Sequence, residues 1–317
     1  MRYRTLGDSG LLVSVVGLGC NNFGGRLDVE RTRAVVDAAI DVGITLLDTA
    51  DIYGNRGGSE EFLGQVLEGR WDKVVLATKW GHQGVDMGYG PAAGAKGGRA
   101  YIRRAVEESL RRLRTDHIDL YQLHTPDPVT PMAETIAAVS ELVAEGKVRY
   151  AGHSNLSGWQ IAEAAHTATE IGGVPFISAQ NHWSLFERAV EQEVVPAAIH
   201  YGLGVLPYFP LANGLLTGKV RRATGIPEGS RLAGRTHLVT EERLDTVERL
   251  VEWGEKHDRS LLEIGIGALA AQPGCSSVIA GATSPEQVIA NAQAGEWEPT
   301  DEELAEIDAV LAGPTAE

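Results

Sequence analysis

The sequence of 317 residues is poor in cysteine and has no long apolar run. Its two cysteines, Cys20 and Cys275, cannot form a disulfide framework or a cysteine-rich zinc site, so we expect a protein of the reducing cytoplasm. The run from Leu11 to Leu18 is short, and no segment approaches the roughly 20 apolar residues of a membrane-spanning helix. We therefore expect no membrane partner.

Basic residues are also scarce relative to acidic ones, 28 against 43, which gives a net charge of -15. Such a charge argues against a nucleic-acid partner or an anionic membrane surface. The arginines of residues 103–114 alternate with Glu107 and Glu108, a pattern typical of a solvated helix face. No spacing of histidine, cysteine or carboxylate residues indicates a metal site, and none is expected. The remaining composition, 43% hydrophobic, is typical of a globular protein with a sizeable core.

Short segments rich in valine, isoleucine and leucine alternate with amphipathic helical segments, which predicts a parallel α/β sheet. Eight strands are expected, the number that closes a (β/α)8 TIM barrel, and the whole chain, residues 1–317, is expected to form one domain. A β-hairpin should precede the barrel within residues 2–14, and additional helices should follow strand seven and end the chain. The predicted strands span residues 13–19, 44–48, 74–79, 117–124, 148–154, 176–181, 204–209 and 277–281. The predicted helices span 28–43, 58–69, 99–114, 131–146, 157–171, 187–201, 241–258, 260–272, 285–294 and 301–312.

A polar or small residue stands where most of these strands end. Intervals between them of 26 to 31 residues, with one of 45, agree with about 31 residues for one strand-helix unit. In barrels of this kind the carboxyl ends of the strands carry the chemistry. The residues concerned are Gly19, Asp48, Lys79, His124, Ser154, Gln180 and Tyr208.

Four of the side chains near these strand ends, Asp48, Tyr53, Lys79 and His124, suit a proton transfer. A phenol with a pKa of about 10 is a weak acid near neutral pH, but a buried ammonium beside it favours the phenolate and lowers that pKa. Asp48 would keep Lys79 charged, and His124 would orient a carbonyl oxygen or relay a proton. As structural alternatives, Asp48 caps a helix, Tyr53 packs, Lys79 extends its stem to reach solvent and His124 is structural.

Ordered motifs over nearly the whole chain resemble the aldo-keto reductase superfamily, in particular bacterial-type NAD(P)H-dependent aldo/keto reductases. They are Asp48-Thr49-Ala50-Asp51-Ile52-Tyr53-Gly54, Ala77-Thr78-Lys79, and the segments 116–124, 145–155, 180–185, 208–211 and 281–287. The resemblance implies reduction of an aldehyde or ketone to an alcohol (EC 1.1.1.-), with a nicotinamide cofactor bound without a Rossmann fold. It makes Tyr53 the general acid, tuned by Lys79 and Asp48, with His124 orienting the carbonyl.

The resemblance also implies a cofactor site and a substrate pocket. NADPH/NADP+ is favoured, although residues 281–295 contain no basic residue to hold a 2′-phosphate and Glu286 would oppose one; NADH/NAD+ is the alternative. Arg231 or Arg235 could compensate from the long loop. Trp80 and Trp183 are expected to wall the substrate pocket. The implied cofactor residues are Gly19, Cys20, Asn21, Asp48, Ser154, Asn155, Gln180, Tyr208, Phe209, Pro210, Leu211, Gly214, Leu216, Gly218, Lys219, Gly281, Thr283, Gln287 and Asn291.

Two other functions stay open. A dehydrogenase could oxidise an alcohol or sugar with the same residues, and the missing basic residues favour NAD+ use. A cofactor-binding regulatory subunit with little turnover, like the β subunits of potassium channels, would keep the barrel and serve a protein partner. A hydrolase using paired carboxylates or a metal fits less well, because Lys79 would compete with a cation. The expected partner is a small carbonyl or alcohol substrate; the sequence indicates neither its identity nor an oligomeric state.

Overall fold

A computed structural model of the chain describes residues 1–313. Its main sheet has eight parallel strands in the order β10-β3-β4-β5-β6-β7-β8-β9, so chain neighbours are sheet neighbours. Eight strands were predicted, and eight are present. They are β3 (Val16–Gly19), β4 (Leu46–Asp48), β5 (Val75–Trp80), β6 (Ile118–Leu123), β7 (Val148–Ser154), β8 (Phe176–Gln180), β9 (Gly204–Val205) and β10 (Val278–Gly281).

The sheet curls until its two edge strands meet. Val205, at the end of β9, forms a parallel bridge to Cys275, just before β10. Beyond β9, Tyr208 forms a parallel bridge to Ile279 of β10, and Ile279 N donates to Pro207 O over 3.0 Å. This arrangement is consistent with a (β/α)8 barrel. Strand β9 is shorter than the predicted 204–209, and Pro207, which has no N–H to donate, interrupts its ladder.

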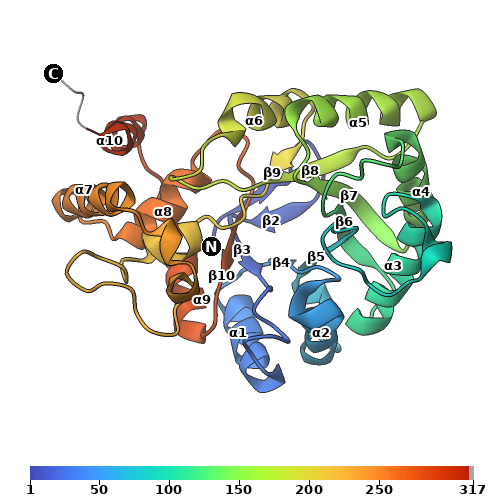
Figure 1. Ribbon diagram of the computed structural model, residues 1–317, viewed down its shortest axis with the longest axis horizontal. Coiled ribbons are helices and arrows are strands. Elements are labelled where there is room, and N and C mark those ends of the chain that lie inside the picture. The colour runs from blue at the N-terminus through green and yellow to red at the C-terminus, as the bar shows by residue number, and fades with distance from the viewer. Residues whose placement is uncertain (314–317) are drawn as a thin grey trace.

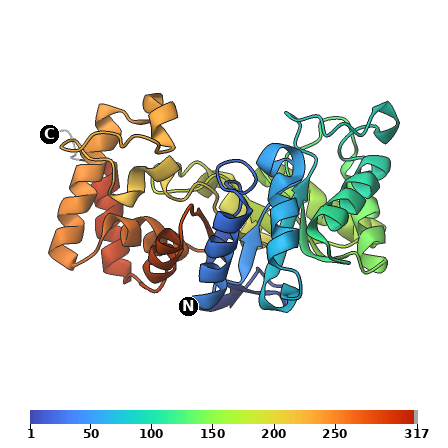
Figure 2. The same ribbon diagram turned by 90° about the horizontal axis from the view of Figure 1, so that it is seen from below.

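Helices surround the curled sheet (Figure 1). Two of them, α7 and α10, pack together away from the sheet, where Trp253 Nε1 donates to Glu306 Oε2 over 2.8 Å; Figure 2 shows them at one end of the molecule. The helices are α1 (Val29–Asp41), α2 (Tyr53–Val66), α3 (Arg99–Leu113), α4 (Met132–Ala144), α5 (Gly158–Ile171), α6 (Val190–His200), α7 (Glu241–His257), α8 (Leu261–Ala270), α9 (Pro285–Ala294) and α10 (Asp301–Ala312).

Helix α2 begins with an unusual turn that follows Tyr53. Residues 54–57 all have positive φ angles, between 62° and 115°, so the regular right-handed helix starts at Gly58, as predicted. A Cβ atom on Gly54 would lie 2.5 Å from Phe23 O and Ser59 N, so this position requires glycine. The turn therefore separates Tyr53 from the body of α2 and leaves it in the loop at the carboxyl end of the sheet.

Helix α9 begins with Pro285 at its first position, after Ser284, as predicted. A capping box, in which Gln287 would accept from Ser284 N, is absent, and Gln287 Oε1 accepts instead from Thr283 N over 2.9 Å. The Gln287 side chain thus reaches back one residue further and holds Thr283.

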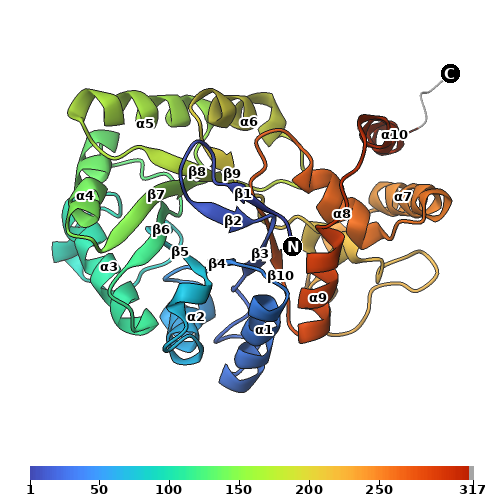
Figure 3. The same ribbon diagram turned by 180° about the vertical axis from the view of Figure 1, so that it is seen from behind.

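The N-terminal strands β1 (Tyr3–Thr5) and β2 (Leu12–Ser14) form an antiparallel hairpin. Figure 3 shows the hairpin lying across the strands of the main sheet, and its turn donates from Asp8 N to Gly202 O, just before β9. It covers the amino-terminal end of the sheet. Its residues Leu6 and Val13 join an inner core with Leu46, Ala77, Leu120, Leu206 and Ile279.

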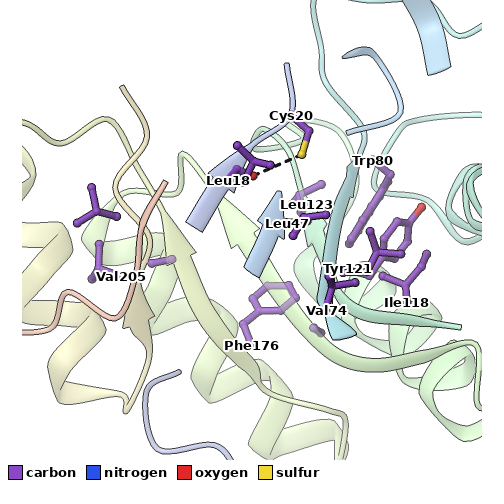
Figure 4. Close-up of a cluster of buried hydrophobic side chains, with 14 of the residues drawn as sticks. Leu18, Cys20, Leu47, Val74, Trp80, Ile118, Tyr121, Leu123, Phe176 and Val205 are labelled. Carbon is purple, nitrogen blue, oxygen red and sulfur yellow. Dashed lines mark hydrogen bonds between the residues drawn. The ribbon is translucent and has the colours of Figure 1, made fainter. Parts of the chain in front are cut away.

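A larger core fills the space between the strands and the surrounding helices. Figure 4 shows part of it, including Leu47, Trp80, Ile118 and Tyr121. Both cores lie below or outside the carboxyl ends of the strands, which leaves those ends to a cavity. No helix within residues 1–313 is both long and apolar enough to cross a membrane.

Candidate active site

A cavity of about 900 Å³ lies at the carboxyl ends of the strands. This volume is near the upper end of the range for small-molecule sites. The cavity is lined by residues that end strands or follow them, including Gly19, Asp48, His124, Ser154, Gln180, Tyr208 and Gly281, together with Tyr53 and parts of the long loop 212–240. Of the strand-end residues singled out from the sequence, all except Lys79 therefore line one cavity.

Asp48 is the centre of a buried hydrogen-bond network. Lys79, which is fully buried, donates from Nζ to Asp48 Oδ2 over 2.7 Å and to Thr49 O over 2.8 Å. The other carboxylate oxygen accepts from Gln180 Nε2 over 2.8 Å. Burial by itself lowers the pKa of the Lys79 ammonium, but Asp48 and Tyr53 raise it, and the net result is a raised pKa. Lys79 is therefore charged at neutral pH.

Tyr53 lies directly above this ion pair. Lys79 Nζ is 5.1 Å from the centre of the Tyr53 ring. Burial raises the pKa of the Tyr53 phenol and Lys79 opposes that shift, so the pKa stays above its ordinary value. The expectation of a lowered pKa was wrong, because loss of solvent outweighs the nearby ammonium. Tyr53 is a neutral phenol whose ionised form Lys79 stabilises.

His124 stands beside Tyr53, with ring centres 5.9 Å apart and the rings edge to face. Burial, followed by the charge of Lys79, holds the pKa of His124 well below its ordinary value, so the imidazole is neutral. A second imidazole, His82 from the loop after β5, lies 4.8 Å from the His124 ring and also lines the cavity. Nothing in the sequence distinguishes His82, because its loop has no periodicity.

The residues expected to face a nicotinamide form one connected network. Ser154 Oγ donates to Gln180 O over 2.8 Å, and Tyr208 Oη donates to Asn155 Oδ1 over 2.9 Å. Asn155 Nδ2 in turn donates to His124 O over 3.0 Å. Of the 19 residues implied for the cofactor, 17 line the cavity. They are Gly19, Cys20, Asn21, Asp48, Ser154, Asn155, Gln180, Tyr208, Phe209, Pro210, Leu211, Gly214, Lys219, Gly281, Thr283, Gln287 and Asn291.

Five expected site residues do not line the cavity, and one of them, Lys79, is fully buried beneath Tyr53. Trp80 is fully buried on the outer face of the sheet, stacked on Tyr121 at 4.4 Å, with its Nε1 donating to Lys96 O. Trp183 is buried in the same core, with its Nε1 donating to Glu191 Oε1. The structure therefore does not support their predicted role as pocket walls. Leu216 is a buried core side chain, and Gly218 lies in the same loop segment.

The cavity also contains a group of positive charges. Arg26, Lys219 and Arg231 line it, and Arg231 donates to the neutral acceptors Asn21 Oδ1 and Asn22 Oδ1. Burial lowers the pKa of Arg231, and the charges of Arg26 and Arg235 lower it further. Of the two arginines considered from the sequence, only Arg231 lines the cavity. Arg26 was missed, since nothing in its sequence context distinguishes it from other arginines.

The described part of the chain contains no group of three or more histidine, cysteine, aspartate or glutamate side chains suited to a metal ion. The positive charges next to neutral acceptors instead suit an anionic ligand. The cavity thus combines a buried ion pair beneath a phenol, two neutral imidazoles and a cationic region.

Comparison with known proteins gives the same family over nearly the whole chain. The sequence pattern described as the Aldo/keto reductase family matches residues 15–312. The uncharacterized oxidoreductase YrpG of Bacillus subtilis (strain 168) is 37% identical over 324 residues, covering 100% of this chain and 98% of the relative. A probable voltage-gated potassium channel subunit beta of Oryza sativa subsp. japonica is 36% identical, covering 98% of this chain and 97% of the relative. The L-glyceraldehyde 3-phosphate reductase of Escherichia coli (strain K12) is 33% identical, covering 98% and 93%. The chain therefore belongs to the aldo/keto reductase family.

Proposed function

We propose that this protein is a (β/α)8-barrel enzyme that reduces an aldehyde or ketone to an alcohol with NADPH. The observation that carries the proposal is the Asp48–Lys79 ion pair, buried beneath the Tyr53 ring and beside the neutral His124. During reduction a carbonyl oxygen gains negative charge, which a hydrogen bond from neutral His124 would stabilise and a proton from Tyr53 would neutralise. The Escherichia coli relative is named for an aldehyde substrate, which supports the substrate class.

In this proposal each residue has one role. His124 holds the carbonyl oxygen by a hydrogen bond, with a ring that stays neutral because burial and Lys79 disfavour its charged form. Tyr53 donates its proton to that oxygen, which becomes the hydroxyl oxygen of the alcohol. Lys79 stabilises the resulting phenolate, and Asp48 holds Lys79 in place. A bound reduced nicotinamide supplies the hydride; the reverse reaction, oxidation of an alcohol, uses Tyr53 as the base.

The residues present fit a nicotinamide dinucleotide. Gln180 directs its Nε2 to Asp48, which leaves its Oε1 as an acceptor for the amide group of a nicotinamide, with Ser154 and Asn155 adjacent. The aromatic ring of Tyr208, held by Asn155, suits stacking on the nicotinamide.

The cationic region supports NADPH over NADH. Arg231 and Lys219 lie on the cavity wall, Arg231 donates only to neutral acceptors among residues 1–313, and an additional phosphate would offset the mutual repulsion of Arg231 and Arg26. Glu286 lines the cavity as well, at the start of α9, and favours a cofactor without the additional phosphate at that end. We assign the 2′-phosphate to the arginines of the loops rather than to residues 281–295.

A second candidate function is supported by the relative named as a potassium channel subunit beta. In that case the same cavity would bind the cofactor to regulate a partner, with little turnover. The two functions differ in whether the protein turns over a substrate with Tyr53 as the proton donor.

The experiment is a steady-state absorbance assay with a reactive aldehyde, 4-nitrobenzaldehyde, and NADPH or NADH. Wild type is compared with Tyr53→Phe and with Tyr3→Phe, a control whose hydroxyl donates to Gly43 O far from the cavity. We expect Tyr53→Phe to lower kcat by at least about 100-fold, the lower range for loss of a general acid, with cofactor affinity retained. Tyr3→Phe should be unchanged.

Equal turnover by wild type and Tyr53→Phe would refute the assignment of Tyr53. Tight cofactor binding without turnover by wild type would favour the regulatory function. If neither cofactor binds, the assignment of the whole cavity fails.

A further inference from the structure

His82 occupies a position that the proposed reaction does not use. Its ring lines the cavity at 4.8 Å from the ring of His124, and the two rings meet edge to face at 80°. His124 in turn lies 5.9 Å from the Tyr53 ring, so Tyr53, His124 and His82 follow one another along the cavity wall. The first two are enough for the reacting carbonyl oxygen, which leaves His82 to contact another part of the substrate.

The hydrogen bond of His82 defines which nitrogen it offers. Its Nδ1 accepts from Gly84 N over 3.1 Å, and an accepting nitrogen in a neutral imidazole places the proton on the other nitrogen. Burial, followed by the charge of Lys96, lowers the pKa of His82, which favours this neutral form. His82 therefore offers an Nε2–H donor.

The loop that carries His82 is fixed to the end of β6. Thr125, the residue after His124, donates from Oγ1 to Gly81 O over 3.1 Å and accepts from Gln83 N over 3.0 Å. Lys96 Nζ donates to the His82 carbonyl oxygen. These contacts hold the backbone on both sides of His82 relative to His124, so the two imidazoles form a preorganised pair.

On the basis of the proposed function, we propose that His82 determines substrate specificity by donating a hydrogen bond to an oxygen on the carbon next to the reacting carbonyl. Oxygen atoms on two neighbouring carbons lie within hydrogen-bond distance of each other when both are on the same side of the carbon–carbon bond. A pair of neighbouring imidazole donors matches such a pair of acceptors. The preferred substrates are accordingly α-oxygenated aldehydes and ketones, such as 2-hydroxyaldehydes.

The test compares 2-hydroxypropanal with propanal, which differ only in the second oxygen. For each variant, kcat/KM for 2-hydroxypropanal is divided by kcat/KM for propanal. This ratio is then compared with the wild-type ratio, so that the intrinsic reactivities of the two aldehydes cancel. We expect His82→Leu to lower this ratio about tenfold, mainly through KM, because one hydrogen bond to substrate is lost. His82→Gln, which keeps a side-chain N–H donor, should restore part of it. His200→Leu, an exposed histidine at the end of α6, is the matched control and should leave it unchanged.

An unchanged ratio in His82→Leu would overturn the inference, even with turnover intact. An equal loss of kcat/KM for both aldehydes, without recovery in His82→Gln, would mean that His82 only supports the fold of the loop, and would overturn it as well. If wild type turns over neither aldehyde with either cofactor, the proposed function itself is refuted and the inference with it.

Discussion

Replacing Lys79 with methionine removes the ammonium group from the centre of the site while retaining a similar chain length. Lys79 is fully buried, and Asp48, only 3% exposed, would lose its charged partner at 2.7 Å. The Asp48 carboxylate would retain the neutral donors Gln180 at 2.8 Å and Gln122 at 3.4 Å. An uncompensated buried charge is the expected result.

The free energy of unfolding should fall because both members of the ion pair, Lys79 and Asp48, are buried. Removing one partner of a buried ion pair costs about 3–5 kcal/mol of unfolding free energy. For 317 residues the entropy of unfolding is about 0.67 kcal/mol/K, so Tm should fall by about 4–8 °C. The double variant Lys79→Met with Asp48→Asn removes both charges and should recover at least about 2 kcal/mol of that loss.

Calorimetry at pH 7 measures this effect, with Lys73→Met as the control. Lys73 is exposed and its partner Asp72 lies 3.4 Å away at the surface, so its loss should cost less than about 1 kcal/mol. If Lys79→Met melts within a degree of Lys73→Met, or if Asp48→Asn does not restore stability, the ion pair does not have the buried character assigned to it. Lys79→Met should also slow aldehyde reduction at pH 7 by about 100-fold or more, because the pKa of Tyr53 rises further without the ammonium.

Three further outcomes follow from the cavity and its surroundings. Arg231→Gln should weaken NADPH binding about 10- to 100-fold in a fluorescence titration and NADH binding less than threefold. As the control, Arg235→Gln should change neither affinity, because Arg235 does not line the cavity. Equal losses of affinity for both cofactors would contradict the assignment of the phosphate to Arg231. Asp51 is buried with neither carboxylate oxygen bonded within residues 1–313, and burial, then Glu60, raises its pKa to about 8. The folded protein therefore holds this proton up to about pH 8, whereas the unfolded chain releases it near pH 4, so the free energy of unfolding falls by on the order of 1.4 kcal/mol per pH unit between these values. Asp51→Asn removes this ionisation and should raise Tm most above pH 8. A rise in Tm of the same size at all pH values would contradict this explanation. Trp183→Phe should lower the free energy of unfolding by about 1–3 kcal/mol but leave KM for an aldehyde within twofold of wild type. A tenfold change in KM would instead indicate that Trp183 contacts the substrate.

The number of strands and the position of the site could be predicted from the sequence because both depend on local, repeated patterns. Apolar runs predict buried strands, and the residue that ends each run lies at the carboxyl edge of a parallel sheet. Asp48, Ser154 and Gln180 were located in this way, and all three line the cavity.

The misplacement of Trp80 has a physical reason that the sequence already contained. Successive side chains of a strand point to opposite faces of the sheet, so the residue after Lys79 must point toward the helices if Lys79 points inward. Trp80 does so, and it stacks on Tyr121 (Figure 4). Trp183 follows the end of β8, where no such alternation applies, and its direction depends on a contact with Glu191 of α6.

Other features required the folded chain. The left-handed turn at 54–57 depends on close contact with the backbone at Phe23, which is distant in sequence. His82 reaches the cavity because Thr125, more than 40 residues further along the chain, anchors its loop. Such contacts leave no periodic signal in the sequence, so the positions of residues on long loops cannot be predicted from it.

The pKa of Tyr53 shows why spacing locates a site without defining its electrostatics. The register of the sheet pairs Asp48 with Ala77, two residues before Lys79, and a shift of one residue would turn Lys79 to the opposite face. Register therefore decides whether the ammonium meets Asp48 at all. How far the pKa of the Tyr53 phenol is shifted then depends on solvent exclusion by side chains from several strands and loops, which outweighs the effect of Lys79. A ligand that places a positive charge beside Tyr53 would lower the pKa of the phenol, in the same direction as Lys79.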